Sequence, residues 1–334
     1  MANKSIEIIE LSKRPYKGHT YSKLILQIRG TDAIPSTING LRRAVYREVP
    51  TYALAPQAMT IEANDSVFNT DRMKLRLAQL PLFGLSNDIT FLPRRFWYEV
   101  DYSDSKRDKH ENDNINFEIY ISAHNDTAIN MDVTTDSVKF YNGGEQIQNI
   151  YKHIAPILIV QLKPNQAFKA RCKAVLGIGE RDDIWASASN CYYKEVGTRD
   201  YKFTMEGRGI MDEYEALIKS CCIIKKKLQD IKTTIGNEFK GSNYNTDKIL
   251  EITLKNEDHT IGEIINEGIQ NHPDILYAGI SKRDLNIKEM TLKISSINKD
   301  PLRAFFDTIK QKTELFDNIE KILLKLSEKY RRTD

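Results

Sequence analysis

A short helical pattern occurs twice in this chain, and the repeat limits the folds open to it more than any other feature of the sequence. The stretches "TINGLRRAVYREVP" (residues 37–50) and "TIGEIINEGIQNHP" (residues 260–273) both begin with Thr-Ile and place a proline thirteen positions after the threonine. An apolar run that alternates with polar residues precedes each stretch, as in a half-buried strand. The repeat predicts two halves built on the same strand and helix.

The second copy shows the pattern more clearly. Alternating apolar residues over 250–254 predict a strand, and Thr260 and Glu263 have the spacing of a capping box at the start of the helix. Pro273 is expected to end that helix. At a spacing of three and four residues, one apolar face of this helix contains Ile261, Ile264, Ile265, Gly268 and Ile269. In the first copy the corresponding face contains Ile38, Leu41, Val45 and Val49.

Each half also carries a long helix with a coiled-coil-like seam. Asp300 and Pro301 suit an N-cap and a first helical residue, so a helix of about thirty residues is expected to begin there. Its seam is broken only by Lys312 and contains Leu302, Phe305, Ile309, Phe316, Ile319, Leu323, Leu326 and Tyr330. The first half has an unbroken seam at Tyr214, Leu217, Cys221, Ile224, Leu228, Ile231 and Ile235.

An insertion separates the parts of the first half. We assign residues 1–54 and 153–240 to a first domain, residues 55–152 to an inserted β-rich domain, and residues 241–334 to a second domain. The insertion contains the strand-like stretches "FEIYISAH" and "SVKFYNGGEQI", and Asn-Gly-Gly in the latter is a plausible hairpin turn. Two polar stretches are predicted to be a solvated loop and a linker, namely residues 101–116 and 236–247.

The composition is that of a soluble globular protein. Of the 334 residues, 40% are apolar and 28% are charged, and the formal net charge is only +3. This charge gives no global argument for nucleic-acid binding, so such a role would need a local patch. The longest uncharged apolar run, residues 154–162, is too short to span a membrane, and the N-terminus lacks the apolar block of a signal peptide. No membrane association is expected.

The cysteines and histidines do not form a recognisable metal motif. The cysteines lie at positions 172, 191, 221 and 222 without a CxxC pair, and the six histidines lack HExxH spacing. We therefore expect reduced, mostly buried thiols in a cytosolic-type compartment, and neither a metal site nor a cofactor.

The sequence also offers no catalytic motif. Gly177 and Gly179 lack the third glycine of a dinucleotide fingerprint and the lysine of a P-loop, and a turn between strands explains them better. Asp182 and Asp183 are expected to lie in a solvated loop. The lysines at 225–227 are predicted to form a solvated face of the first long helix.

Arg42 and Arg43 stand out, because a short helix has little room for two adjacent arginines beside its apolar face. A guanidinium group offers five donors in a rigid fork that suits a carboxylate or carbonyl groups on a partner. The other interpretation is an exposed pair that keeps the helix soluble. Their spacing alone does not decide between the two.

Several longer stretches resemble a known family. Residues 38–82, "INGLRRAVYREVPTYALAPQAMTIEANDSVFNTDRMKLRLAQLPL", resemble the signature of the alpha-like assembly subunits of multisubunit DNA-dependent RNA polymerase, in particular the third-largest eukaryotic subunit. Residues 156–186 and the helix "YEALIKSCCIIKKKLQDI" agree with it. "LEITLKNEDHTIGEIINEGIQNHPDILYAGI" is similar to the small alpha-like partner of that subunit. The likeness is loose only over much of residues 83–150.

The resemblance implies a fold and a set of partners. Two alpha-like chains of this family dimerise through paired helices and form the platform for the two largest, catalytic subunits. The expected fold is thus α+β, an internal pseudo-dimer of two alpha-like dimerisation domains with one inserted β-rich domain. The internal dimer interface would contain Leu41, Val45, Leu217, Ile224, Ile261, Ile264, Ile265, Gly268, Phe305 and Ile309. Carried over by motif, Arg43 and Arg42 would face the second-largest subunit, and Arg76 would lie near the base of the insertion as a further partner contact.

Two departures from the family pattern affect these expectations. Many relatives of the larger partner carry a cysteine-rich zinc loop in the insertion, whereas residues 83–116 contain no cysteine. The small partner has His-Pro-Leu after its third strand, where this chain has Arg-Asp-Leu at residues 283–285. No zinc is therefore expected, and details of that second surface are open.

The expected function is that of a non-catalytic assembly subunit of DNA-dependent RNA polymerase. Its partners would be the two largest subunits and small polymerase subunits, and it would meet DNA only indirectly through the complex. The fusion resembles polymerases of large DNA viruses, which implies the host cytoplasm or the virion, with the nucleus as another possibility. The alternative is a stand-alone enzyme with its active site in the insertion, where His110 and His124 are the only histidines and neither has a nearby nucleophile motif.

Overall fold

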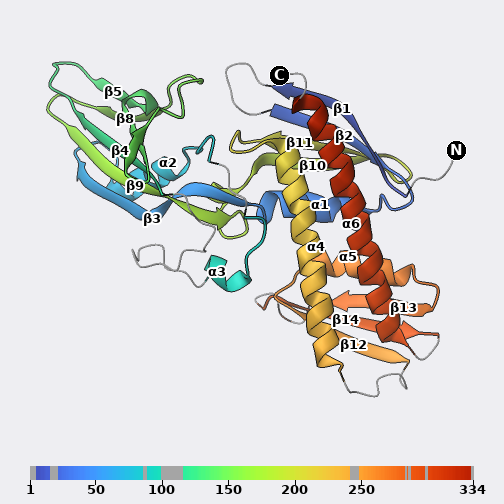
Figure 1. Cartoon of the computed structure of the whole chain (residues 1–334). Helices are drawn as coiled ribbons and strands as arrows, with labels where there is room; N and C mark the ends of the chain where they lie inside the picture. The colour runs from blue at the N-terminus through green and yellow to red at the C-terminus, as the bar shows by residue number, and fades with distance from the viewer. Residues whose placement is uncertain are drawn as a thin grey trace.

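A computed structural model describes residues 5–15, 22–85, 89–98, 116–240, 248–282, 284, 287–297 and 300–331. Within these residues the fold is α+β, with antiparallel sheets and six α-helices. Residues 101–115 of the predicted loop, residues 241–247 of the predicted linker, and Arg283 and Leu285 lie outside the described residues. The linker prediction is wrong for residues 236–238, which are helical. Figure 1 shows the inserted strands on one side of the molecule and two long helices, α4 and α6, on the other.

The first half forms a four-stranded sheet in the order β1-β2-β11-β10. Its strands are β1 (Glu7–Pro15), β2 (Ser22–Arg29), β10 (Ala188–Gly197) and β11 (Asp200–Gly207). Its helices are the short α1 (Pro35–Arg47) and the long α4 (Glu213–Glu238). The predicted order of strand, short helix, strands and long helix is therefore present in the first half.

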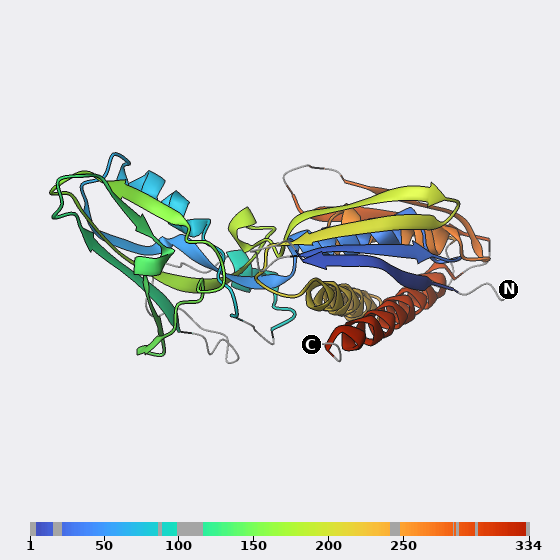
Figure 2. The ribbon, with the colours of Figure 1, turned by 90° about the horizontal axis from the view of Figure 1, so that it is seen from above.

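The second half repeats this order with a three-stranded sheet, β12-β14-β13. The strands are β12 (Ile249–Lys255), β13 (Ile275–Ser281) and β14 (Glu289–Ser296), and the helices are α5 (His259–Gln270) and α6 (Pro301–Arg331). Seen from above, α4 and α6 lie together on one side of the strands (Figure 2). They run antiparallel, because Gly236 near the end of α4 lies by Phe306 near the start of α6.

The inserted part is built on a five-stranded sheet in the order β3-β9-β4-β6-β7, with a separate β5-β8 pair. The strands of the larger sheet are β3 (Pro50–Asn64), β4 (Phe117–His124), β6 (Lys139–Asn142), β7 (Glu145–Ile147) and β9 (Ala167–Ile178). The pair consists of β5 (Met131–Thr134) and β8 (Leu158–Leu162), and two short helices are α2 (Thr70–Ala78) and α3 (Arg94–Tyr98). The predicted turn at Gly143 and Gly144 joins β6 to β7, and both glycines have positive φ.

The structure has two hydrophobic cores, and their limits differ from the expected domain boundaries of 55 and 152. One core contains residues of both halves, such as Leu26 and Ile252. The other runs from Tyr52 to Trp185. Residues 153–185 pack with the insertion because β9 pairs with β3 along its length, from Pro50 opposite Ile178 onward. The apolar pattern of β9 indicated a strand but could not indicate which sheet it would join.

The observed helix ends agree only in part with those predicted from the sequence. At the start of α6, the Asp300 carboxylate accepts a hydrogen bond from the Arg303 backbone N–H at 2.9 Å, which confirms the predicted N-cap. The predicted capping box at Thr260 is wrong, because Asp258 is the N-cap of α5 and accepts from the Thr260 N–H at 2.8 Å. Helix α1 begins at Pro35, two residues before the expected start.

Candidate functional site

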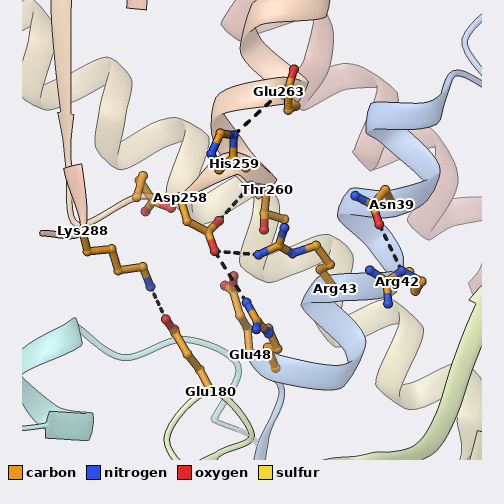
Figure 3. Close-up of polar contacts among 12 residues, drawn as sticks. Asn39, Arg42, Arg43, Glu48, Glu180, Asp258, His259, Thr260, Glu263 and Lys288 are labelled. Atoms are coloured by element: carbon orange, nitrogen blue, oxygen red, sulfur yellow. Dashed lines mark hydrogen bonds and ion pairs between the residues drawn. The ribbon is translucent and has the colours of Figure 1, made fainter. Parts of the chain in front are cut away.

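Helices α1 and α5 cross so that each end of one helix contacts the opposite end of the other. Near the end of α1, the Arg43 guanidinium Nη2 lies 2.9 Å from Oδ2 of Asp258 at the start of α5 (Figure 3). Near the start of α1, the Ser36 N–H donates to Oε2 of Glu267 in the last part of α5 at 3.3 Å. Each of the two contacts thus joins the first part of one helix to the last part of the other.

A glycine allows the two helices to approach closely at the centre of this crossing. A Cβ atom at Gly40 would lie 2.6 Å from Cδ1 of Ile264. About one turn further along α5, a Cβ atom at Gly268 would lie 2.6 Å from a methyl carbon of Thr308 and 2.7 Å from Cε of Lys312 on α6. Small residues at these two positions therefore permit the packing of α1, α5 and α6.

The structure places the residues expected at an internal interface in a single core. Nine of the ten are buried members of the core that both halves share, namely Leu41, Val45, Leu217, Ile224, Ile261, Ile264, Ile265, Phe305 and Ile309. Gly268, the tenth, is half-buried against α6. Lys312, which breaks the α6 seam, is itself only 7% exposed, and burial lowers the pKa of its ammonium group although Glu267 and Asp32 lie near enough to oppose the shift.

Polar contacts along α4 and α6 tie the two long helices together. Lys225 lies 3.1 Å from Asp317 and also pairs with Glu320. The Cys222 thiol donates to the Glu320 carboxylate at 3.1 Å. Burial, with this hydrogen bond to a carboxylate, raises the pKa of Cys222 to about 11, so the thiol stays protonated. Lys225 is thus part of the contact between the halves, and the predicted solvated face is wrong at this position.

Lys227 is buried at the junction of the halves. The prediction that the lysines at 225–227 form a solvated face is therefore wrong at this position too. The ammonium group of Lys227 lies 2.8 Å from Glu48, just after α1, and 3.3 Å from Glu257, just before α5. All three side chains are 12% exposed. Burial raises the pKa of Glu257 to about 7; Lys227 opposes this shift and Glu48 adds to it. One lysine therefore compensates two carboxylates from different halves.

The insertion contacts the second half through another ion pair. Glu180, which follows β9, accepts a hydrogen bond from Lys288 next to β14 (Figure 3). Burial by itself would raise the pKa of Glu180, but the hydrogen bond and charge of Lys288 outweigh burial and hold it below the usual value. Arg94 of α3 lies 3.8 Å from the same carboxylate.

A cavity of about 260 Å³ opens at this three-way junction. Its walls combine apolar side chains from the insertion, such as Phe91, Leu92 and Trp97, with the charged groups of Lys227, Glu257 and Lys288. The junction thus holds the first half, the second half and the insertion in one arrangement by buried charge pairs, which require good geometry to be stable.

Comparisons with known proteins indicate the kind of protein to which this chain is similar. Residues 249–321, which include β12 to β14, α5 and most of α6, match the family of the RNA polymerase Rpb3/Rpb11 dimerisation domain. The chain is also 21% identical to a protein of Acanthamoeba polyphaga mimivirus that carries the provisional name of a DNA-directed RNA polymerase subunit. That match covers 97% of this chain and 98% of the viral one. Both matches support an alpha-like RNA polymerase subunit.

The three arginines expected to contact partners also make contacts inside the chain. Arg42 donates through Nε to the Asn39 side chain of the same helix at 3.0 Å. Arg43 pairs with Asp258 and keeps 23% of its side chain exposed. Arg76 on α2 donates to the backbone carbonyls of Leu158 and Ile159, at 2.9 and 2.7 Å, and fixes α2 against β8.

The chain contains no recognisable catalytic arrangement in the part that the structure describes. No group of three or more His, Cys, Asp or Glu side chains there is placed to hold a metal ion. His124 lies 2.9 Å from Asp126, where both side chains are exposed, and His110 is outside the described residues. Among the described helices none is long and apolar enough to cross a membrane.

Gly179 lies in a turn directly after β9, as predicted, whereas Gly177 lies within the strand, and both glycines also have a packing role. Gly177 lies within β9, where a Cβ atom would be 2.4 Å from the indole of Trp185. At Gly179 a Cβ atom would be 2.4 Å from the backbone carbonyl oxygen of Tyr46. Gly179 therefore lets the insertion meet the end of α1 closely, and Gly177 makes room for the Trp185 ring.

Several residues of the junction were missed by sequence reasoning: Glu48, Glu180, Glu257, Asp258 and Lys288. Asp258 had a usable signal, because an aspartate two residues before Thr260 can accept its N–H as an N-cap. Glu257 lies beside it in "EDHTIG", a stretch that carries the resemblance. The other three had no signal, since single charged residues in polar segments are normally solvated.

Proposed function

We propose that this chain is a non-catalytic assembly-platform subunit of a DNA-directed RNA polymerase. Its two alpha-like halves pair within one polypeptide and nucleate the binding of the two largest, catalytic subunits. The observation that carries the proposal is the reciprocal crossing of α1 and α5, with Arg43 on Asp258 at one end and Ser36 on Glu267 at the other.

The second half supports an internal dimer most directly. It matches a dimerisation domain, and such a domain needs a partner to cover its apolar helix face. Here α1 and α4 of the same chain cover that face, in a single core with α5 and α6. A chain that supplies both partners does not need a second alpha-like subunit.

The two catalytic subunits would bind at surfaces left around this platform. Arg42 and Arg43 are half-buried on α1, so each retains guanidinium donors for a partner besides its contact within the chain. Arg76 is exposed on α2 and would add a contact from the insertion. Small polymerase subunits would bind the same platform, and contact with template DNA would be made by the large subunits.

The test is co-purification of the tagged full chain from cells in which its polymerase is made. We expect two very large subunits to purify with it, and a stand-alone enzyme would purify alone. Arg42→Glu is the sharper variant, because Arg42 has no carboxylate partner in the described part of the chain and its reversal should leave the fold intact. Loss of a charged contact at an interface typically costs about 2–5 kcal/mol.

Arg43→Glu should also weaken assembly, and its thermal stability must be measured in parallel because it loses the pair with Asp258. Arg303→Glu is the matched control, since Arg303 has a side chain that is 78% exposed on α6. If both the Arg42→Glu and the Arg43→Glu variant recover the two large subunits at wild-type levels, these arginines do not lie in the interface.

A further inference from the structure

The outward face of the inserted five-stranded sheet has an unusual composition. Because side chains alternate along a strand, one face of β4, β6 and β9 is buried in the core of the insertion and the other points outward. On β9 three successive outward positions are all basic and exposed, namely Lys169, Arg171 and Lys173. Alternate residues of a strand lie about 6.6 Å apart, so these cations form a regular row.

Two tyrosines lie beside this row on the neighbouring strands. Tyr120 of β4 is directly opposite Arg171 of β9 on one side and Lys139 of β6 on the other. Tyr141 of β6 is opposite Glu118 of β4, which is one outward position from Tyr120. Both tyrosines are half-buried, which leaves part of each ring open to solvent on the basic face.

A hollow of about 440 Å³ opens over the same face. Its lining includes Tyr120, Tyr141 and Arg171, together with the two carboxylates of Glu62 and Glu118. This volume falls within the range of small-molecule sites and is large enough for a nucleobase with its sugar. The hollow therefore combines two aromatic rings and one cation with two carboxylates, and the remaining cations of the face lie around it.

The charges on this face are only partly compensated. Glu118 lies 3.3 Å from Lys173 and 3.8 Å from Arg171. Lys139 and Lys169 form no ion pair with any residue that the structure describes, and both are exposed. The face thus has a local positive charge that the small net charge of the whole chain conceals.

We propose that this face of the insertion binds single-stranded nucleic acid. The basic row on β9 would follow the phosphates, and Tyr120 and Tyr141 would stack on bases that enter the hollow. Proteins that bind single strands without sequence preference combine these two elements, a positive groove and an aromatic platform. An acidic protein segment would use the cations equally well but would leave both tyrosine rings without a specific role.

The experiment measures binding of fluorescein-labelled dT20 and U20 to the full chain by fluorescence anisotropy over a series of salt concentrations. The variant Lys169→Gln/Arg171→Gln/Lys173→Gln should weaken binding at least tenfold. It should also reduce the slope of log Kd against log salt by about 2, because each phosphate contact on a single strand contributes about 0.7. A control with the same number of charges removed elsewhere is Lys194→Gln/Lys202→Gln/Lys232→Gln, and it should bind as wild type.

The tyrosines provide the decisive measurement. Tyr120→Ala/Tyr141→Ala should weaken binding about tenfold with an unchanged salt slope, and Tyr120→Phe/Tyr141→Phe should restore it, because phenylalanine keeps the stacking face. Far-ultraviolet circular dichroism and thermal melting confirm that each variant is folded. The proposal fails if the wild type does not bind either oligonucleotide. It also fails if the alanine variant binds as wild type while a poly-glutamate peptide competes fully, which would identify an acidic protein partner instead.

Discussion

Arg43 on α1 and Asp258 at the start of α5 form an ion pair of 2.9 Å between residues that are 215 positions apart in the chain. Asp258 also caps α5 through the Thr260 N–H, and Arg47 lies 3.8 Å from its carboxylate. Burial alone would raise the pKa of Asp258, but the hydrogen bonds from Thr260 and the charge of Arg43 outweigh burial and hold it below the usual value. One carboxylate thus starts a helix in one half and binds the other half.

These two roles of Asp258 can be separated by substitution. Asp258→Asn keeps an oxygen for the cap but loses the ion pair, and should lower the free energy of unfolding by about 1 kcal/mol. Asp258→Ala loses both and should cost about 2 kcal/mol. Urea unfolding measures these values. The control is Asp300, an N-cap without an ion pair among the described residues. Asp300→Asn should be nearly neutral, and equal costs for the two asparagine variants would contradict a stabilising role for Arg43.

Lys227 should be among the most sensitive positions of α4. Lys227→Met would leave the buried carboxylates of Glu48 and Glu257 without their shared cation, and breaking a buried pair in this way costs about 3–5 kcal/mol. Adding Glu48→Gln and Glu257→Gln should recover much of that loss, because the uncompensated charges are then removed. Lys232→Met on the exposed side of α4 is the control. If Lys227→Met melts at the same temperature as that control, the buried network does not exist.

Glu257 should make stability fall as pH rises from about 4.5 to 7. Its folded pKa is about 7 because of burial, against a usual value of 4.5. The folded state therefore binds more protons than the unfolded state in this window, and the free energy of unfolding decreases with rising pH by at most about 3 kcal/mol. Glu180 and Asp258 act in the opposite direction and lose their contribution in acid, since their pKa values are lowered.

The measurement is urea unfolding at pH 5 and pH 8, for the wild type and for Glu257→Gln. The glutamine variant should lack the part of the decrease that Glu257 contributes, so the two proteins should differ in their pH slope. Identical slopes would show that Glu257 titrates in the folded chain as it does in the unfolded one.

The pairing of the halves predicts that the chain tolerates a cut between them. A protease site introduced between residues 240 and 248 should give two fragments that still elute together in size exclusion, because buried helix faces hold them. In the uncut chain the covalent connection raises the effective concentration of one half for the other, which for short linkers is in the millimolar range. Ile265→Glu places a charge in the shared core and should separate the fragments.

Leu276→Glu is the control for that experiment, since Leu276 is in the same fragment and is 73% exposed. Its fragments should remain associated. Separation of the wild-type fragments after the cut would refute an internal dimer interface.

Metal removal should leave the fold unchanged. Structural zinc sites depend on clustered thiolate and imidazole ligands. The sequence has no cysteine before Cys172, so the N-terminal half of the chain has no thiolate for such a site. Dialysis against a chelator should not alter the midpoint of thermal unfolding, and elemental analysis should find no stoichiometric zinc. Zinc at one equivalent, with unfolding on chelation, would contradict this expectation.

The local patterns of the sequence predicted the elements well where each depends on near neighbours. The seams of α4 and α6, the strand before each short helix, and the cap at Asp300 all follow from spacing within a few turns or one strand. The resemblance over residues 38–82 and the C-terminal part then indicated what the repeated unit is for. The spacing of apolar residues shows which side of a helix or strand is buried, and this spacing can be read from the sequence alone.

Only the tertiary structure decided which elements meet. The lysines at 225 and 227 had the sequence of a solvated helix face, yet each found carboxylates on the other half of the molecule. Strand β9 had the pattern of any half-buried strand, and its register with β3 moved residues 153–185 into the insertion. Arg43 likewise found Asp258 only because α1 and α5 cross. The partner of a charge, and the sheet that a strand joins, depend on segments far away in the chain, and a single sequence does not encode those distances locally.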